Sequence, residues 1–227
     1  MIVGVLLAAG ASRRMGRDKA LVRARGRSFT AHGLHHLWSA CDAVVIVLGA
    51  NAARIRHAIE TEFERLVASP ELRRDLDQAR RHGARGLEAR FVLNRAWESG
   101  MLGSVRVGLR RALAFGPELV LILPVDHPRI RTRTVQALAA TMREALGAFT
   151  RRPRQRDAFA YALVPRHRRQ GGHPIALSPG LARAIVADRG AATLSEAVRR
   201  NSRLVGYLDT ADSGVLDNRN APSGARR

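Results

Sequence analysis

The chain has 227 residues, of which 46% are hydrophobic, and a formal net charge of +20. This length suits one sizeable domain, and the apolar share is large enough for a core, which excludes a globally disordered chain. The sequence has no apolar run of about 18 residues, so no transmembrane helix is expected. Cys41 is the only cysteine, which excludes an internal disulfide and fits a reducing cytoplasm, the expected location.

The positive charge is spread along the chain, from Arg13 to Arg227, and aromatic residues make up only 4% of it. Because a single-strand-binding surface needs basic residues gathered with aromatic ones, nucleic acid is not the expected partner. The excess charge suits a solvated surface together with a phosphate-handling site. Lys19 is the only lysine. Its compact ammonium group fits a tight phosphate pocket better than a planar guanidinium does.

Short apolar runs alternate with amphipathic segments. Residues 2–7, IVGVLL, are apolar throughout, as in a strand buried on both faces of a parallel sheet. In chain order we expect strand 2–7, helix 30–40, strand 43–48, helix 52–63, strand 91–93, helix 101–114, strand 119–123, helix 132–146, strand 159–164, helices 181–187 and 194–200, and strand 204–208. Segment 64–90 is expected to be a charged helical or loose insertion, and 165–173 a polar loop.

This alternation predicts an α/β fold with three layers (α/β/α) and a mostly parallel sheet. We expect one domain over residues 1–222 and a loose C-terminal tail over residues 223–227. Ligands of such open sheets bind beyond the carboxyl ends of the strands. The segments that follow the first and fourth expected strands are therefore the places to look for a site.

The loop that leaves the first strand reads LAAGASRRMGRDK over residues 7–19. Its small residues let the backbone approach a ligand closely, and successive N–H groups can form an anion-binding nest. The P-loop pattern and the G-x-G-x-x-G dinucleotide fingerprint are both absent from it. As a generic Gly-Ala segment, it could equally be an ordinary turn with a solvated basic face.

The same loop contains L-A-A-G-x-S-x-R-M-G-x-x-K, which closely resembles the signature of the MobA-like NTP-transferase family. That family includes the molybdenum-cofactor cytidylyl- and guanylyltransferases. The resemblance implies a nucleotide-diphospho-sugar-transferase-like, Rossmann-like fold and a nucleotidyltransferase activity. It implies that Arg14 and Lys19 act on the phosphates as catalytic residues. The nucleotide-binding residues that it implies in this loop are Leu7, Ala8, Ala9, Gly10, Arg14 and Lys19.

The fourth strand runs into Pro124-Val125-Asp126-His127-Pro128. An acid just past a buried strand is well placed to hold Mg²⁺, which prefers one or two carboxylates with phosphate oxygens and water. The alternative is an Asp that caps the next turn. In the resemblance this acid, within a D-x-P pattern, is the main metal ligand and a catalytic residue. His127 is a candidate for contact with the acceptor.

Three further segments bear on the resemblance. Residues 94–109 match N-x-x-W-x-x-G-M-x-x-S-x-x-x-G-L, which places Gly100 and Ser104 near the nucleotide. Val164-Pro165 and Gly172-His173-Pro174 match a V-P … G-H-P segment beside the acceptor pocket, which makes His173 an acceptor-binding candidate, although a lone histidine is more often structural. In the related D-x-G-A-R segment, residues 188–192, the arginine is replaced by Ala192.

The C-terminal segment departs most from the family. Asn218 and Asn220 stand where cytidylyltransferase-like relatives carry D-x-D, and N-x-N is found in guanylyltransferase-like and sugar-type relatives. A carboxamide oxygen can bind Mg²⁺ but brings no charge. We therefore expect metal affinity to be weaker, with Asp126 and Asn220 as the metal ligands. The alternative is that this segment is only a closing turn.

Together these residues and the family resemblance imply an Mg²⁺-dependent nucleotidyltransferase. It would move a nucleoside monophosphate from an NTP, CTP in preference to GTP, to a small phosphorylated acceptor such as molybdopterin. A sugar phosphate or another small phosphate is an alternative acceptor. An alternative of another class is a non-catalytic nucleotide- or nucleic-acid-binding module with a degraded metal site. No membrane partner is expected, and the sequence gives no oligomeric state.

Overall fold

The computed structural model describes residues 1–11, 18–81, 88–149 and 159–218. An eight-stranded sheet runs through it in the order β10-β7-β9-β6-β1-β4-β5, with β8 paired to β7. Its strands are β1 (Ile2–Ala8), β4 (Ala43–Leu48), β5 (Glu88–Leu93), β6 (Leu119–Pro124), β7 (Tyr161–His167), β8 (Gln170–Gly171), β9 (Ile175–Leu177) and β10 (Leu204–Asp209). A small hairpin, β2 (Arg23–Ala24) with β3 (Arg27–Ser28), stands apart from it.

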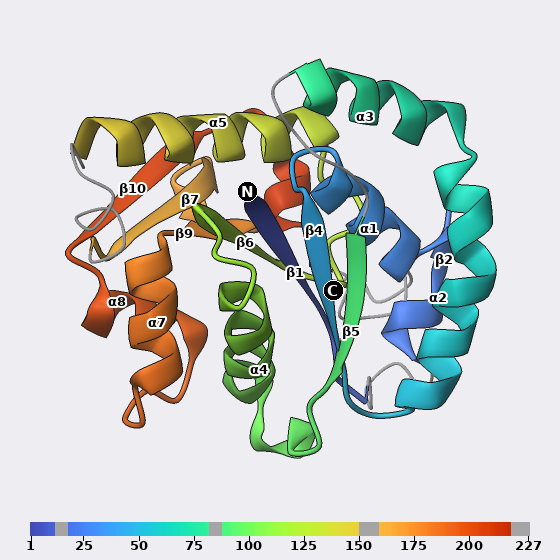
Figure 1. The fold of residues 1–227 in the computed structure, drawn as a ribbon, viewed down its shortest axis with the longest axis horizontal. Coiled ribbons are helices and arrows are strands. Elements are labelled where there is room, and N and C mark those ends of the chain that lie inside the picture. The colour runs from blue at the N-terminus through green and yellow to red at the C-terminus, as the bar shows by residue number, and fades with distance from the viewer. Residues whose placement is uncertain (12–17, 82–87, 150–158, 219–227) are drawn as a thin grey trace.

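Helices cover both faces of this sheet (Figure 1). They are α1 (Phe29–Trp38), α2 (Ala52–Val67), α3 (Pro70–Arg81), α4 (Met101–Leu113), α5 (Thr132–Phe149), α7 (Pro179–Ala187) and α8 (Leu194–Asn201), with short 3₁₀ turns η2 (Lys19–Leu21), η3 (Trp97–Ser99) and η4 (Ser213–Leu216). One apolar cluster joins the sheet to α1, α2, α3 and α5, and the other joins it to α4, α7 and α8. The expected three-layer α/β/α architecture is confirmed.

The central strands form because their side chains are apolar on both faces. In β1, Leu6 belongs to one cluster, and its neighbours Val5 and Leu7 belong to the other. Strand β1 pairs in parallel with β4 and β6, β4 with β5, and β7 with β10. Only β8 and β9 pair antiparallel within the large sheet, so the sheet is mostly parallel as expected.

Each expected strand and helix is present, and the differences lie mainly at the boundaries. Strand β5 begins at Glu88, three residues before the expected start at 91. In the expected insertion, the described part is the end of α2, the helix α3 and the start of β5. The polar loop predicted over 165–173 is wrong, because β7 continues to His167 and turns back into β8. No helix in the described ranges is long and apolar enough to cross a membrane.

Gly108 lets α4 lie close against the sheet. A Cβ at this position would lie 2.4 Å from Val5 Cγ1 and 2.8 Å from Val47 Cγ2, and β-branched side chains have little rotameric freedom to move away. We expect Gly108→Ala to destabilise the fold by about 1–3 kcal/mol in urea unfolding, although alanine is the better helix former. The control is Gly147→Ala in α5, where no heavy atom lies within 4 Å of the added Cβ. It should stabilise by up to about 1 kcal/mol, and equal effects of the two substitutions would contradict this account.

His36 is buried in α1 and fixes the segment that follows β6. Its Nε2 lies 3.3 Å from the carbonyl oxygen of Pro128, and burial lowers the pKa of His36 from 6.5 to about 3. Between these two pH values the unfolded chain therefore binds the proton and the folded one does not. Acidification then destabilises the fold by about 1.4 kcal/mol per pH unit below 6.5.

We expect the free energy of unfolding to fall by about 2 kcal/mol from this group between pH 7 and pH 5. His36→Leu removes the titrating ring, so the variant should lose less stability over the same interval. Urea unfolding of both proteins at the two pH values measures the difference. An identical pH dependence would show that His36 does not stay neutral in the fold.

Candidate nucleotide-binding site

The candidate site lies where β1 and β6 end side by side. Leu7 pairs with Pro124 in the parallel register, and the N–H of Val125 donates to the carbonyl of Leu7 at 3.1 Å. The loop after β1 and the acid after β6 therefore meet at one edge of the sheet. A cavity of about 550 Å³ opens there. It is lined by Leu7, Ala8, Ala9, Gly10, Ala11, Lys19, Ala20, Trp97, Glu98, Gly100, Met101, Ser104, Pro124, Val125 and Asp126.

Lys19 and Asp126 come together in this cavity. Lys19 Nζ lies 3.5 Å from Asp126 Oδ2, and their side chains are only 16% and 15% exposed. The other carboxylate oxygen, Asp126 Oδ1, is buried with no hydrogen-bond partner among the described residues. The site thus holds an ammonium group beside a carboxylate that still has an unused oxygen.

Lys19 is held in place by a contact that the sequence did not predict. The preceding residue, Asp18, is buried and accepts a hydrogen bond from Asn51 Nδ2 at 2.8 Å. Asn51 has a left-handed backbone, with φ of 54°, in the loop between β4 and α2. Asparagine tolerates that conformation better than most residues. The loop after β4 therefore fixes where the loop after β1 ends.

The residues of the N-x-x-W … G-L block divide into structural and cavity-facing positions. Asn94 is buried and donates to Ser104 Oγ at 2.9 Å, which ties the loop after β5 to α4. Gly108 is explained by helix packing, as shown above. Trp97 and Gly100 line the cavity together with Met101, a residue that is 55% exposed. The match of this block to the family thus reflects both folding and the site.

Gly49 allows the β1 loop and Trp97 to approach each other. A Cβ on Gly49 would lie 2.5 Å from the carbonyl oxygen of Ala9 and 2.6 Å from Trp97 Cβ. The N–H of Ala50 also donates to that carbonyl at 3.1 Å. The end of β4 therefore supports two walls of the cavity.

A match to known proteins agrees with this geometry. The sequence matches the MobA-like NTP transferase domain family over residues 4–204. The chain belongs to this family. It is accordingly an enzyme of the nucleotidyltransferase class.

The relatives of this MobA-like chain carry different names. It is 31% identical to the nicotine blue oxidoreductase of Paenarthrobacter nicotinovorans, over 94% of this chain and 89% of that protein. It is 29% identical to a probable molybdenum cofactor guanylyltransferase of Opitutus terrae, over 66% of this chain and 60% of that protein. The purine catabolism protein PucB of Bacillus subtilis is 30% identical over 66% of this chain and 67% of its own length.

Solved structures confirm the expected nucleotide-diphospho-sugar-transferase-like fold of this family member. A nucleotidyl transferase from Methanothermobacter superposes with a TM-score of 0.66 at 18% identity, covering 97% of this chain and 92% of that one. The molybdopterin-guanine dinucleotide biosynthesis protein A of Archaeoglobus fulgidus superposes with a TM-score of 0.58 at 17% identity, covering 98% and 93%.

The donor set of this MobA-like site fits a magnesium ion. Mg²⁺ binds through one or two carboxylates and completes its shell with phosphate oxygens and water. Asp126 offers one carboxylate with a buried, unpartnered oxygen. Within the ranges that the structure describes, no group of three His, Cys, Asp or Glu side chains could form an all-protein metal site. A metal here would therefore depend on substrate phosphates.

His127 and His173 lie behind Asp126 and do not line the nucleotide cavity. Their rings are 5.0 Å apart, and His127 Nε2 lies 3.8 Å from Asp126 Oδ1. Burial lowers the pKa of His127, and burial together with His127 lowers the pKa of His173 to about 3. Both rings are therefore neutral at physiological pH. Their Nδ1 atoms are buried, and the described part of the chain gives neither of them a hydrogen-bond partner.

The remaining candidate positions that the structure describes, Asn218 and Asp188, do not line the cavity. Arg14 and Asn220 lie outside the described residues. Asn218 is exposed after η4, and its N–H donates to the carbonyl of Leu216 at 2.8 Å. In the D-x-G-A segment, Asp188 accepts hydrogen bonds from Asn201 Nδ2 and from the N–H of Gly190, and the bond from Asn201 contributes most to lowering the pKa of Asp188. That segment is a structural turn between α7 and α8.

Proposed function

We propose that this chain transfers a nucleoside monophosphate from an NTP to a small phosphorylated acceptor and releases pyrophosphate. The observation that carries the proposal is the pairing of Lys19 with Asp126 at 3.5 Å, inside a cavity that the small residues of the β1 loop also line. Phosphoryl-type transfer needs a cation-rich cradle for the phosphates and a carboxylate for a divalent metal. Both lie here within one cavity.

The mechanism follows from charge and position. The NTP phosphates lie along the N–H groups of the β1 loop, with Lys19 and Arg14 against them. A phosphate oxygen of the acceptor attacks the α-phosphorus in line, and the bond from the α-phosphorus to the bridging oxygen breaks, so that pyrophosphate leaves. The acceptor phosphate is already ionised, so no general base is required. Asp126, with Asn220 as the family pattern assigns it, would hold Mg²⁺, which would neutralise charge on the phosphate oxygens.

The nucleobase and the acceptor occupy opposite sides of Asp126 in this proposal. Trp97 and the exposed Met101 form an apolar wall against which a base can pack. CTP is the preferred donor because the L-A-A-G loop and the G-M-x-x-S block resemble the cytidylyltransferase branch of the family. GTP is second, since one relative is named a guanylyltransferase. On the acceptor side the family pattern assigns His127 and His173, although neither ring lines the nucleotide cavity. Molybdopterin is the first candidate acceptor and a sugar phosphate the second.

A redox reaction is the second candidate function, because the relative that matches over 94% of this chain is named an oxidoreductase. The two reactions consume different substrates. Nucleotidyl transfer releases pyrophosphate from an NTP. A reduction that uses a nicotinamide cofactor instead oxidises NADH or NADPH, which is measured as a fall in absorbance. Measuring both with the same preparation separates the candidates.

Binding of the four NTPs with Mg²⁺, followed by thermal shift, tests the proposal first. A ligand at 100 times its dissociation constant stabilises the fold by about 2.7 kcal/mol, which raises the melting temperature by several degrees. Pyrophosphate release is then measured with molybdopterin and with sugar phosphates. Stabilisation by CTP and acceptor-dependent release support the proposal. NTP binding without release from any acceptor favours the non-catalytic module.

A further inference from the structure

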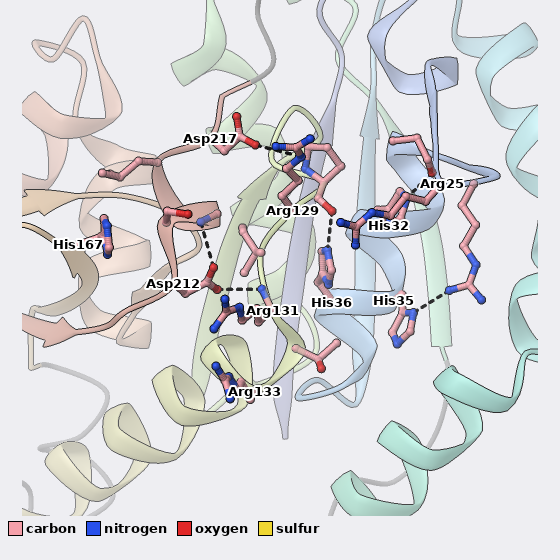
Figure 2. Close-up of a pocket in the computed structure, with 18 of the residues that line it drawn as sticks. Arg25, His32, His35, His36, Arg129, Arg131, Arg133, His167, Asp212 and Asp217 are labelled. Atoms are coloured by element: carbon pink, nitrogen blue, oxygen red, sulfur yellow. Dashed lines mark hydrogen bonds and ion pairs between the residues drawn. The ribbon is translucent and has the colours of Figure 1, made fainter. Parts of the chain in front are cut away.

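A second and larger cavity, of about 1700 Å³, opens on the α1–α5 side of the sheet and shares no lining residue with the nucleotide cavity. We call it the arginine groove. Figure 2 shows side chains from α1, from the start of α5 and from the segment around η4 pointing into it. The turn of the β2–β3 hairpin, the turn between β7 and β8, the segment after β6 and Glu71 of α3 also line it.

The arginine groove has more positive than negative charge. Its lining includes six arginines, Arg25, Arg27, Arg129, Arg131, Arg133 and Arg168, and three carboxylates, Glu71, Asp212 and Asp217. Three histidines of α1 also border it. One of them, His36, is neutral because burial lowers its pKa to about 3.

The three carboxylates already have partners inside the protein. Glu71 pairs with Arg27 at 2.9 Å, and Asp217 pairs with Arg129 at 3.4 Å. Asp212 accepts hydrogen bonds at 2.8 Å from the N–H of Arg131 and at 2.9 Å from that of Gly214. These acids are therefore used to hold the groove together.

Four guanidinium groups remain. Arg25, Arg131, Arg133 and Arg168 are exposed and make no ion pair with any residue in the ranges that the structure describes. They come from the β2–β3 turn, from the start of α5 and from the β7–β8 turn. A ligand in the groove can therefore meet positive charge from three directions.

Two of these arginines stand where the backbone favours another residue. Arg25 and Arg168 have φ of 49° and 48°, in the left-handed region. Glycine, which has no Cβ, or asparagine, whose short polar side chain can hydrogen-bond locally, is more stable at such positions, by roughly 1 kcal/mol. Both hairpin turns beside the groove thus carry a charged side chain despite local strain.

The lining favours one kind of ligand. Its volume exceeds the roughly 300–1,000 Å³ of small-molecule pockets. Among the described residues, the exposed large hydrophobic side chains all lie outside it, namely Met1, Leu93, Met101, Leu204 and Tyr207. A protein partner would need apolar anchors of that kind. A phosphate chain needs only charge, and guanidinium groups bind phosphate through two parallel hydrogen bonds.

We propose that the arginine groove binds the phosphodiester backbone of nucleic acid, independently of base sequence. Among the described residues that line the groove, histidine is the only aromatic type, so base stacking contributes little there. The sequence predicted no nucleic-acid partner because its arginines are scattered along the chain. The fold gathers six of them from three separate segments, between positions 25 and 168.

The test is fluorescence anisotropy of labelled DNA duplexes of 8, 16 and 24 base pairs and of an RNA hairpin, measured from 50 to 300 mM NaCl. The groove variant is Arg25→Asn, Arg168→Asn, Arg131→Gln and Arg133→Gln. Both asparagine substitutions relieve backbone strain, so this variant should fold. The control variant removes four exposed arginines that line neither cavity, Arg65→Gln, Arg110→Gln, Arg189→Gln and Arg199→Gln, which gives the same net charge.

Each phosphate contact contributes about 0.9 to the slope of log affinity against log salt on B-DNA. We expect the magnitude of this slope to fall by about 3–4 in the groove variant, and its affinity at 100 mM salt to fall at least tenfold. The affinity of the control variant should fall less than threefold. Equal losses in the two variants would show that bulk charge binds the nucleic acid and would overturn the proposal. Unchanged binding by the groove variant would also overturn the proposal. If inorganic tripolyphosphate competed as well as the 24-base-pair duplex, the ligand would be a small phosphate compound, and the proposal would again be overturned. A higher affinity for the DNA duplexes or for the RNA hairpin shows which nucleic acid the groove binds.

Discussion

Asp126→Asn is expected to lower the rate of pyrophosphate release by about 10³-fold or more, the scale seen when a preorganised charge is removed from a reacting centre. Asparagine has nearly the same shape as aspartate but no charge. It loses both the ion pair with Lys19 and the carboxylate that would hold a divalent metal. The effect should fall on turnover rather than on folding, since the side chain lies at the cavity wall and not in either apolar cluster.

The measurement is pyrophosphate release against Mg²⁺ concentration, with melting temperature recorded for each protein. Asp209→Asn is the matched control. It removes an exposed carboxylate that pairs with Arg166 at 2.8 Å at the far edge of the sheet, and it should change the rate less than twofold. A full rate in Asp126→Asn would remove Asp126 from the catalytic site, and the proposed reaction would then need another metal ligand.

The meeting of Lys19 with Asp126 could be predicted because it follows from sheet topology. Both residues come just after apolar runs that read as buried strands, and the carboxyl ends of neighbouring parallel strands share one edge. The structure adds that β1 and β6 are direct neighbours. The family resemblance named the same residues, and the fold explains why they are close together although 107 positions apart.

The features that the sequence did not predict depend on contacts between distant segments. Strand β9 has only three residues, and it forms because it pairs with β6 on one side and β7 on the other. The bond from Asn51 to Asp18 joins two loops with no shared motif. The arginine groove likewise has no local pattern, since its charges come from segments that are separate until the chain folds.

Lys19→Met is expected to change two affinities in opposite directions. Methionine has a similar length but no charge, so the NTP loses a charged contact worth roughly 1.5–3 kcal/mol, which corresponds to about a 10- to 100-fold weaker affinity. In the free enzyme, however, the ammonium lies where it neutralises Asp126. Its removal leaves that carboxylate uncompensated, and Mg²⁺ should then bind the free protein more tightly than it binds the unmodified one.

Calorimetry with MgCl₂ alone and then with an NTP measures both effects. Lys19→Arg is the control, because it keeps the charge but replaces a compact ammonium with a planar fork. If the narrow cavity explains why an arginine-rich chain has its single lysine here, Lys19→Arg should also weaken NTP binding, without tightening Mg²⁺ binding. If Lys19→Met weakened the binding of both Mg²⁺ and the NTP, Lys19 would be supporting the loop after β1 rather than competing with the metal. Unchanged NTP affinity in both variants would separate Lys19 from the phosphates altogether.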